Sequence, residues 1–363
     1  MKFKNVQALR AIAAILVVGA HLYPLEQKCI PGQPFLKWFE PLGVAGVDLF
    51  FVISGFVIIT STWSSFAKPG IGQNFILRRA ARIFPVYWVV LIPIALLDIF
   101  APRWVNSSQV IRPDIFASFA LLPQAGIPLL TVSWSLVYEM YFYYIYAIAI
   151  NFHATLLPWI LGAWMLLTAA IFFAFPQTKM PYLAQMGNTI TYEFSYGLLI
   201  GWWQIQKRKP IAALPIIAVG TVIVLLNTAF YSGYGSYLHG PLRFLFVGLP
   251  MAFILYGFVG LEVNKQFTCA GLIVLLGDAS YSLYLWHAPI LDAIGHLSMH
   301  RHILSQPIFH WLWLALSTAI VIAIALLLYR TIEYRLVRAF GKLLHLKSPG
   351  SILPNVSAIT PSN

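Results

Sequence analysis

The segment VAGVDLFFVISGFVIITSTW, residues 44–63, decides the fold class of this chain. It contains one charged residue, Asp48, and as an α-helix it is long enough to cross the roughly 30 Å hydrocarbon core of a bilayer. Comparable apolar stretches of about 20 residues recur along the whole sequence. We therefore predict an all-α, polytopic integral membrane protein.

The composition excludes a water-soluble globular domain. Of the 363 residues, 60% are hydrophobic and only 9% are charged, whereas soluble domains carry about 25% charged residues. The net charge of +12 does not indicate nucleic-acid binding, because the Lys and Arg residues form short clusters between apolar stretches. Neither the two cysteines, Cys29 and Cys269, nor the histidines between positions 296 and 310 form a metal-binding pattern, so no metal site is expected.

Ten stretches are apolar enough to be predicted as transmembrane helices. They are residues 8–23, 44–63, 83–100, 134–150, 156–175, 190–206, 212–230, 242–261, 277–297 and 309–329. Residues 114–123 are too short to span, and we expect an interfacial or re-entrant piece there. The first stretch lacks a convincing cleavage site, so we interpret it as a retained helix and not as a signal peptide.

The distribution of Lys and Arg predicts the orientation of these spans. With the N-terminus inside, 15 of the 23 Lys and Arg residues fall on the cytoplasmic side and 6 fall outside. The positive-inside rule thus predicts both termini in the cytoplasm, as in a multi-pass protein of the cell inner membrane. We expect one membrane domain over residues 1–347 and a disordered tail over residues 348–363.

Arg10 and His21 are ionisable residues within the first span, where charged groups are costly and therefore candidates for function. Eleven helical steps come to about 1100°, so the two side chains share one helix face and lie about 16 Å apart along its axis. A cation near the cytoplasmic rim and an imidazole deeper in the membrane suit an anionic ligand that enters from the cytoplasm. The alternative is a capping arginine and a histidine bonded to a neighbouring helix.

A second basic cluster precedes the third span. Arg79 and Arg82 are three residues apart and are neighbours on one helix face, with Arg78 beside them. Guanidinium groups bind phosphate in a bidentate manner, which makes this pair a candidate phosphate site. Membrane topology alone also places arginines at an inner boundary, and that alternative stays open.

Two acidic residues, Asp48 and Glu139, lie inside predicted spans. Counting from the ends of the spans places both in the outer half of the membrane, in the same layer as His21. A carboxylate beside His21 would fix its tautomer and raise its basicity, as a general base requires. Asp48 could instead form a purely structural ion pair with Arg243.

The ninth span carries the sequence SYSLYLWHAP, residues 280–289. Pro289 should kink or break the helix just past His287 and leave nearby carbonyl groups exposed. Tyr281, Trp286 and His287 are therefore candidates for contact with an acceptor substrate. The alternative is a packed, hydrogen-bonded aromatic patch.

Five motifs in this order resemble the acyltransferase-3 family of membrane-bound acyltransferases, and they extend over nearly the whole chain. They are Arg10 followed by His21 after ten residues, GVDLFFVISGF (46–56), Arg79-x-x-Arg82 with IFPVYW (83–88), WSLVYE (134–139) and SYSLYLWH (280–287). The opening VQALRA (6–11) and the surroundings of Glu139 look most like the branch that modifies exopolysaccharide or O-antigen.

The resemblance implies ten helices, an acyl-CoA donor and a carbohydrate hydroxyl on the periplasmic side as acceptor. His21 is then the implied catalytic histidine, with Glu139 as the acidic residue and Asp48 as a further participant. Arg10, Arg79 and Arg82 are implied to bind the CoA end of the donor. The expected partners are acyl-CoA, the lipid bilayer and an exopolysaccharide, O-antigen or lipid-linked glycan, with no nucleic acid and no permanently bound cofactor.

The resulting hypothesis is a membrane-bound O-acyltransferase, with acetyl-CoA as the expected donor. The CoA phosphates would bind the arginines, and the extended pantetheine arm would bring the thioester to His21, which would act as general base. A proton-coupled transporter is the alternative, because buried His, Asp and Glu side chains also relay protons. A non-catalytic scaffold in a polysaccharide export complex is a third possibility.

Overall fold

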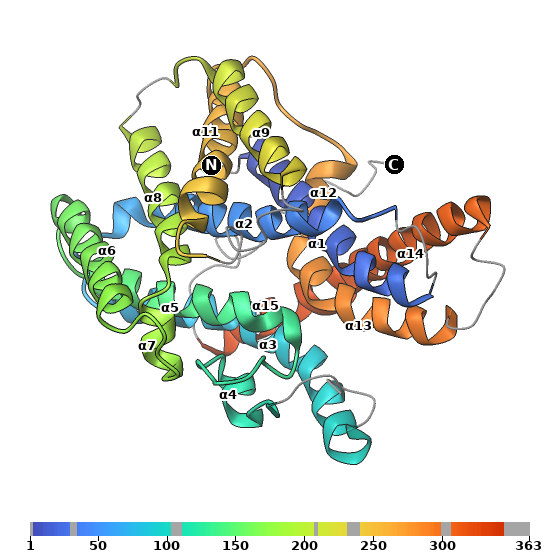
Figure 1. Cartoon of the computed structure of the whole chain (residues 1–363). Helices are drawn as coiled ribbons and strands as arrows, with labels where there is room; N and C mark the ends of the chain where they lie inside the picture. Colours follow the sequence, from blue (N-terminus) through green and yellow to red (C-terminus); the bar gives the residue numbers. More distant parts are fainter. Residues whose placement is uncertain are drawn as a thin grey trace, which may run out of the picture.

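The computed structural model describes residues 3–29, 35–102, 111–206, 210–230, 240–298 and 306–344. Within these ranges the regular structure is helical and contains no strand, which confirms the predicted all-α class. The predicted tail at 348–363 lies outside the described residues. Figure 1 shows α2 running through the middle of the molecule, with α1 beside it.

The helices cover the predicted apolar stretches, and α1, α2 and α3 begin before them. The α-helices are α1 (Lys4–Cys29), α2 (Phe39–Thr62), α3 (Ile71–Phe100), α4 (Ile115–Ala120), α5 (Trp134–Ala149), α6 (Leu157–Ala174), α7 (Pro181–Met186), α8 (Tyr192–Ile205), α9 (Ala213–Ala229), α11 (Leu249–Val263), α12 (Leu272–Asp278), α13 (Ser280–Ser298), α14 (Pro307–Leu328) and α15 (Tyr334–Leu343). Two π-helical turns, η7 (Phe244–Gly248) and η9 (Tyr329–Glu333), lead into α11 and α15.

Every predicted span coincides with a helix of the structure, and the short stretch near residue 114 forms only the six-residue α4. Six of the described helical stretches are both long and apolar enough to cross a membrane. They are Lys4–Cys29, Phe39–Ser65, Ile71–Phe100, Ala154–Ala174, Phe244–Val263 and Pro307–Leu343. The chain is therefore a helical multi-pass membrane protein, while the number of ten spans and the orientation of the termini stay predictions.

One helix boundary differs markedly from the sequence-based expectation. Helix α3 begins at Ile71 and not near residue 83, so Arg79 and Arg82 lie inside the helix. Backbone hydrogen bonds continue a helix through polar residues, which a search for apolar runs misses. Helix α13 follows its predicted span and continues past Pro289 to Ser298, so the proline does not break the helix. Proline is tolerated inside membrane helices because neighbouring groups satisfy the backbone atoms that it frees.

Glycines bring the central helices into backbone contact. A Cβ atom at Gly55 of α2 would lie 2.1 Å from the Phe194 carbonyl oxygen of α8, and one at Gly197 would lie 1.9 Å from the Val52 carbonyl oxygen. Small residues permit this close approach between membrane helices, where dispersion contacts drive the association. The α2–α8 pair thus forms a rigid centre, with Phe142 of α5 stacked on Phe194 at 4.1 Å between ring centroids.

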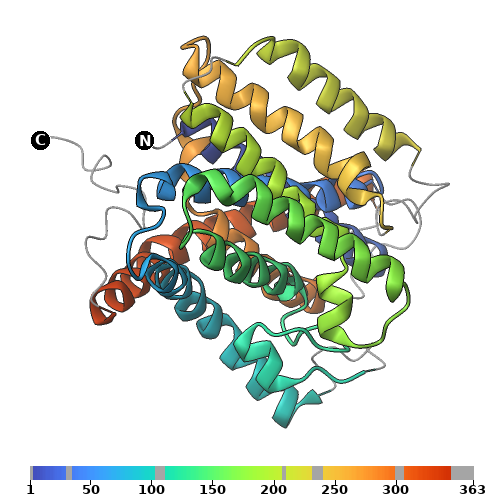
Figure 2. The same ribbon diagram turned by 90° about the vertical axis from the view of Figure 1, so that its left-hand side faces the viewer.

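The remaining helices surround this centre. Helices α9 and α11 pack side by side at one edge, whereas α13 and α14 pack beside α1 at another (Figures 1 and 2). Helix α3 packs against α5 and α15. Many large apolar side chains face outward, and Phe173 on α6 is 78% exposed. An apolar outer surface of this kind is stable in contact with lipid.

Candidate active site

A cavity of about 100 Å³ lies among α1, α2, α3, α5 and α13. Its polar and ionisable lining residues are Arg10, Ser54, Arg79, Arg82, Ser135, Glu139, Tyr143, Ser280, Tyr281 and Tyr284. On α2 the lining extends from Val47 to Val57, which corresponds to about 15 Å along the helix axis. The cavity is therefore elongated along the helices and brings together five of the nine residues predicted as site residues.

The three predicted phosphate-binding arginines, Arg10 from α1 and Arg79 and Arg82 from α3, meet at this cavity. In the part of the chain that the structure describes, none of them forms a hydrogen bond or an ion pair. The Arg79 guanidinium carbon lies 5.1 Å from the centre of the Tyr143 ring and 5.5 Å from that of Phe75, at cation–π distance. Ring faces thus hold the cation while its N–H donors stay available to an anion.

A carboxylate that sequence analysis did not single out faces these arginines. Glu333 of η9 is buried, accepts a 2.6 Å hydrogen bond from the Ser282 hydroxyl, and interacts electrostatically with Arg10 and Arg82. It offsets part of the positive charge without forming an ion pair to either arginine. Only the tertiary fold brings η9 to this position, so no local sequence signal predicts it.

Glu139 lies at the cavity and not beside His21. Its Oε1 atom accepts a 3.0 Å hydrogen bond from the Ser54 hydroxyl and another from the Tyr143 hydroxyl. This network connects α2 and α5 across the cavity. The predicted contact between Glu139 and His21 is therefore absent from the described structure.

His21 has a defined tautomer. Its Nδ1 atom lies 2.9 Å from the Val17 carbonyl oxygen. Because a carbonyl only accepts, Nδ1 carries the hydrogen, and in the neutral imidazole Nε2 then presents a lone pair, which is the form that a general base requires. The partner of Nδ1 is thus a backbone carbonyl of the same helix and not a carboxylate. The carboxylate that interacts electrostatically with His21 is Asp292 of α13, which the sequence-based prediction did not assign to the site.

His287 connects the cavity to His21. The two imidazole rings meet edge to face, with 4.7 Å between their centroids. The His287 ring also lies 5.8 Å from the ring of Tyr284, which lines the cavity. Tyr284 and His287 of α13 therefore lie between the arginine-lined cavity and the His21 imidazole of α1.

The other two predicted substrate-binding residues lie differently. Tyr281 lines the cavity, and its hydroxyl donates a 2.8 Å hydrogen bond to the Ile83 carbonyl of α3. Trp286 packs against the aromatic core and is not among the lining residues of the cavity. Its buried indole nitrogen has no partner among the described residues. Within the motif on α13, Tyr281 thus lies at the cavity and Trp286 lies in the core.

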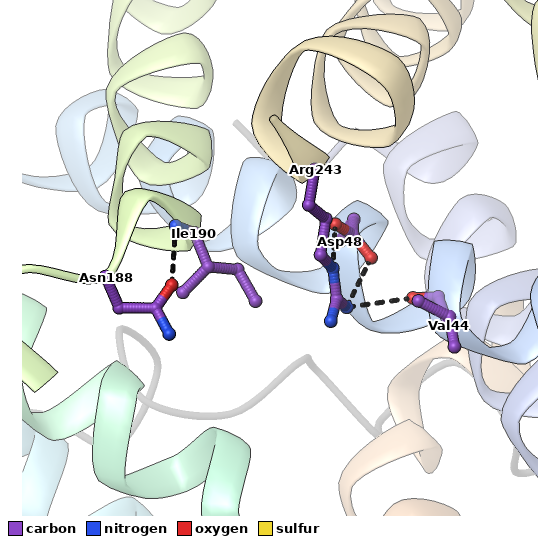
Figure 3. A network of polar contacts seen from close by, with 5 residues as sticks. All are labelled: Val44, Asp48, Asn188, Ile190 and Arg243. Atoms are coloured by element: carbon purple, nitrogen blue, oxygen red, sulfur yellow. Dashed lines mark hydrogen bonds and ion pairs between the residues drawn. The ribbon is translucent and has the colours of Figure 1, made fainter. Parts of the chain in front are cut away.

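Asp48 forms the structural ion pair that the sequence left open as an alternative. Figure 3 shows the Arg243 side chain reaching from the start of η7 to α2. There its Nε and Nη2 atoms donate to the two Asp48 oxygens at 2.9 and 2.7 Å, and Nη2 also reaches the Val44 carbonyl at 3.5 Å. Asp48 is fully buried and does not contact His21. In the same view, the Asn188 side chain accepts from the Ile190 amide at 3.0 Å before α8 begins.

The chain matches one protein family and several known proteins. A family model described as an acyltransferase domain matches residues 3–330. The exopolysaccharide production protein ExoZ of Rhizobium meliloti is 31% identical over 261 residues, which are 70% of this chain and 78% of ExoZ. The peptidoglycan O-acetyltransferase OatA of Listeria monocytogenes is 26% identical over 323 residues, 79% of this chain and 49% of OatA.

The O-acetyltransferase OatA of Staphylococcus aureus is 25% identical over 366 residues, 90% of this chain and 56% of that protein. The chain thus spans about half the length of the two OatA proteins and most of ExoZ. No solved structure matches the chain. These matches give no support to the alternative of a transporter.

Proposed function

Because the chain belongs to the acyltransferase-3 family and is an acyltransferase with membrane helices, we propose that it transfers an acyl group, acetyl in the first instance, from acyl-CoA to a hydroxyl of an exported carbohydrate. The acceptor class follows the printed names of its relatives, an exopolysaccharide production protein and two O-acetyltransferases, one of them named for peptidoglycan. We place the protein in the cell inner membrane with both termini in the cytoplasm.

One observation carries the proposed donor: Arg10, Arg79 and Arg82 converge on one cavity without ion-pair partners in the described ranges. CoA carries several phosphate groups, and a phosphate binds guanidinium groups through short, charge-assisted hydrogen bonds. An anionic ligand would also relieve the repulsion between Arg10 and Arg82. We propose that the phosphates bind at this end, while the pantetheine arm follows the cavity toward Tyr284 and His287.

The acceptor hydroxyl is activated by His21 in this proposal. The His21 residue is exposed, and its Nε2 lone pair is free to accept the hydroxyl proton as the oxygen attacks the acyl carbonyl. The nearby Asp292 carboxylate stabilises the imidazolium that results. In the net reaction, the carbon–sulfur bond of the donor is broken, an ester forms, and CoA is released as the thiolate.

Mass spectrometry of surface glycans tests this function. Cells with the protein should carry glycans with an added acyl mass that mild alkali removes, and cells without it should lack that mass. Cells that make the His21→Ala variant at the same level serve as the matched control. Identical glycans in all three strains would contradict the proposal.

A further inference from the structure

The two imidazoles at the α1–α13 contact share one hydrogen-bond pattern. In His287, as in His21, Nδ1 lies at hydrogen-bond distance from carbonyl oxygens of its own helix, here Tyr284 at 2.7 Å and Leu283 at 3.2 Å. Nδ1 is therefore the donor in both rings, and in the neutral rings Nε2 is an acceptor with no hydrogen-bond partner among the described residues. The rings differ in environment, because His287 is fully buried whereas His21 is exposed.

The buried Nε2 atom of His287 requires an explanation. It has no hydrogen-bond partner among the residues that the structure describes. Leaving a buried acceptor unsatisfied costs about 1–3 kcal/mol, and native proteins keep few such groups. A desolvated imidazole with an available lone pair is also a nucleophile. Its ring lies next to Tyr284 of the cavity on one side and next to His21 on the other.

We propose that His287 is a catalytic residue whose Nε2 atom takes the acyl group from the donor before the acceptor receives it. This inference rests on the proposed acyl-CoA-dependent function. In the first step, Nε2 of neutral His287 attacks the thioester carbonyl, the carbon–sulfur bond breaks, and CoA leaves as the thiolate. The product is an acyl-imidazolium that keeps its Nδ1 hydrogen on the backbone carbonyls of α13.

In the second step, the acceptor hydroxyl attacks the acyl carbon while His21 Nε2 takes its proton. The carbon–nitrogen bond breaks, and His287 returns to its neutral form with the electron pair on Nε2. His21 then releases its proton, so the sum is thioester plus alcohol giving ester, thiolate and one proton. No other reactant is needed.

The positions of the two rings favour this division of roles. His287 lies one side chain beyond the arginine-lined cavity, where the donor is proposed to bind. Its full burial excludes the water that would hydrolyse an acyl-imidazole. His21 is the exposed member of the pair and can meet an acceptor that arrives from outside the helix bundle. The two rings are in edge-to-face contact, with 4.7 Å between their centroids, so the base is adjacent to the ring that carries the acyl group.

Rapid-quench measurement of CoA release without acceptor tests this inference. Purified protein in detergent is mixed with acetyl-CoA, and free CoA is quantified by mass spectrometry. The wild type should release a fast burst of CoA proportional to the amount of protein, followed by slow hydrolysis. The His21→Ala variant should keep the burst but lose transfer to glycan. The His287→Gln variant, which keeps a polar side chain without a nucleophilic nitrogen, should lose the burst while binding CoA normally.

His153→Ala is the matched control, because this exposed histidine hydrogen-bonds to nearby Thr155 between α5 and α6 and should release CoA like the wild type. His287→Asn is a second variant, to be used if the glutamine variant does not bind CoA. A normal burst in a His287 variant would overturn the inference, as would glycan acylation by the wild type without any burst. If cells with the wild type add no acyl group to glycan, the proposed function itself fails.

Discussion

The His21 imidazole presents an unprotonated Nε2 because its Nδ1 hydrogen lies on the Val17 carbonyl. Replacing His21 with alanine removes this base and should lower glycan acylation by roughly 10²- to 10⁴-fold, which is the usual contribution of a general base. Acylation can be followed as base-labile label from radioactive acetyl-CoA, with His153→Ala as the control. A His21→Ala protein that acylates at the wild-type rate would exclude this role.

Arg79 and Arg82 of α3, which have no ion-pair partner among the described residues, lead to a prediction about the donor. Arg79→Ala combined with Arg82→Ala should weaken acyl-CoA binding by roughly 10²- to 10⁴-fold, because each of the two lost charge-assisted hydrogen bonds costs about 1.5–3 kcal/mol. Binding is measured by displacement of labelled CoA from detergent-solubilised protein. The matched control replaces Arg335 and Arg338, which are exposed on α15, and should leave the affinity unchanged. Equal affinities in both double variants would remove the arginines from the donor site.

The buried pair of Asp48 and Arg243 leads to a prediction about stability. Asp48→Asn breaks the buried ion pair of Arg243, which then has the nearby Glu193 carboxyl group to offset its charge, and should destabilise the fold by up to about 3–5 kcal/mol. Thermal unfolding in detergent measures this, with Asp98→Asn on α3 as the control, since Asp98 forms no ion pair among the described residues. If Asp48→Asn instead unfolds like the control but stops acylation, Asp48 belongs to catalysis.

Spacing along single helices predicted part of the site. Arg79 and Arg82 share a helix face, and Arg10 lies on the same helix as His21, so each pair could be assigned from the sequence. The contacts between helices could not be assigned. Counting residues along each predicted span gives the depth of a side chain in the membrane, but it does not determine which side chains of different helices are in contact. Glu333 and Asp292 were missed for this reason, and the predicted carboxylate partners of His21 bind other groups instead.

Among the helices, the α2–α8 contact leads to a further prediction. Gly197→Leu would push a side chain into the backbone of α2 and should destabilise the protein by about 1–3 kcal/mol or more, since overpacking forces the backbone to shift. Gly162→Leu on α6 is the matched control, because a Cβ atom there has nothing within 4 Å. Equal unfolding temperatures for the two variants would contradict the rigid α2–α8 centre.

The helices themselves were easier to predict than their ends. Twenty apolar residues have few stable arrangements in a bilayer other than a helix, so the hydropathy pattern located the long apolar helices, although not α7 or α15. The start of α3 at Ile71 was missed because its first turns are polar and basic. That extension matters for function, since it carries Arg79 and Arg82 along the helix to the cavity wall.

The predicted orientation of the whole molecule, with both termini in the cytoplasm, determines which face is accessible to a cytoplasmic donor. This orientation can be measured with single cysteines in a variant without Cys29 and Cys269. One cysteine replaces Lys37, between α1 and α2, and the other replaces Lys342, on α15. A membrane-impermeant maleimide should label Lys37→Cys in intact cells and Lys342→Cys only after the cells are opened. The reverse labelling would place the termini outside.

Transfer through the helix bundle is measured most directly in inverted membrane vesicles, whose cytoplasmic face is outside. Radioactive acetyl-CoA is added to vesicles that contain the wild type, the Arg79→Ala plus Arg82→Ala variant or the His21→Ala variant. The wild type should transfer the radioactive acetyl group to carbohydrate inside the vesicles, as label that base removes. Both variants should transfer little of it. Two results would contradict transfer from an arginine-bound donor to an acceptor activated by His21. One is unlabelled carbohydrate in wild-type vesicles, and the other is equal labelling of carbohydrate in all three kinds of vesicle.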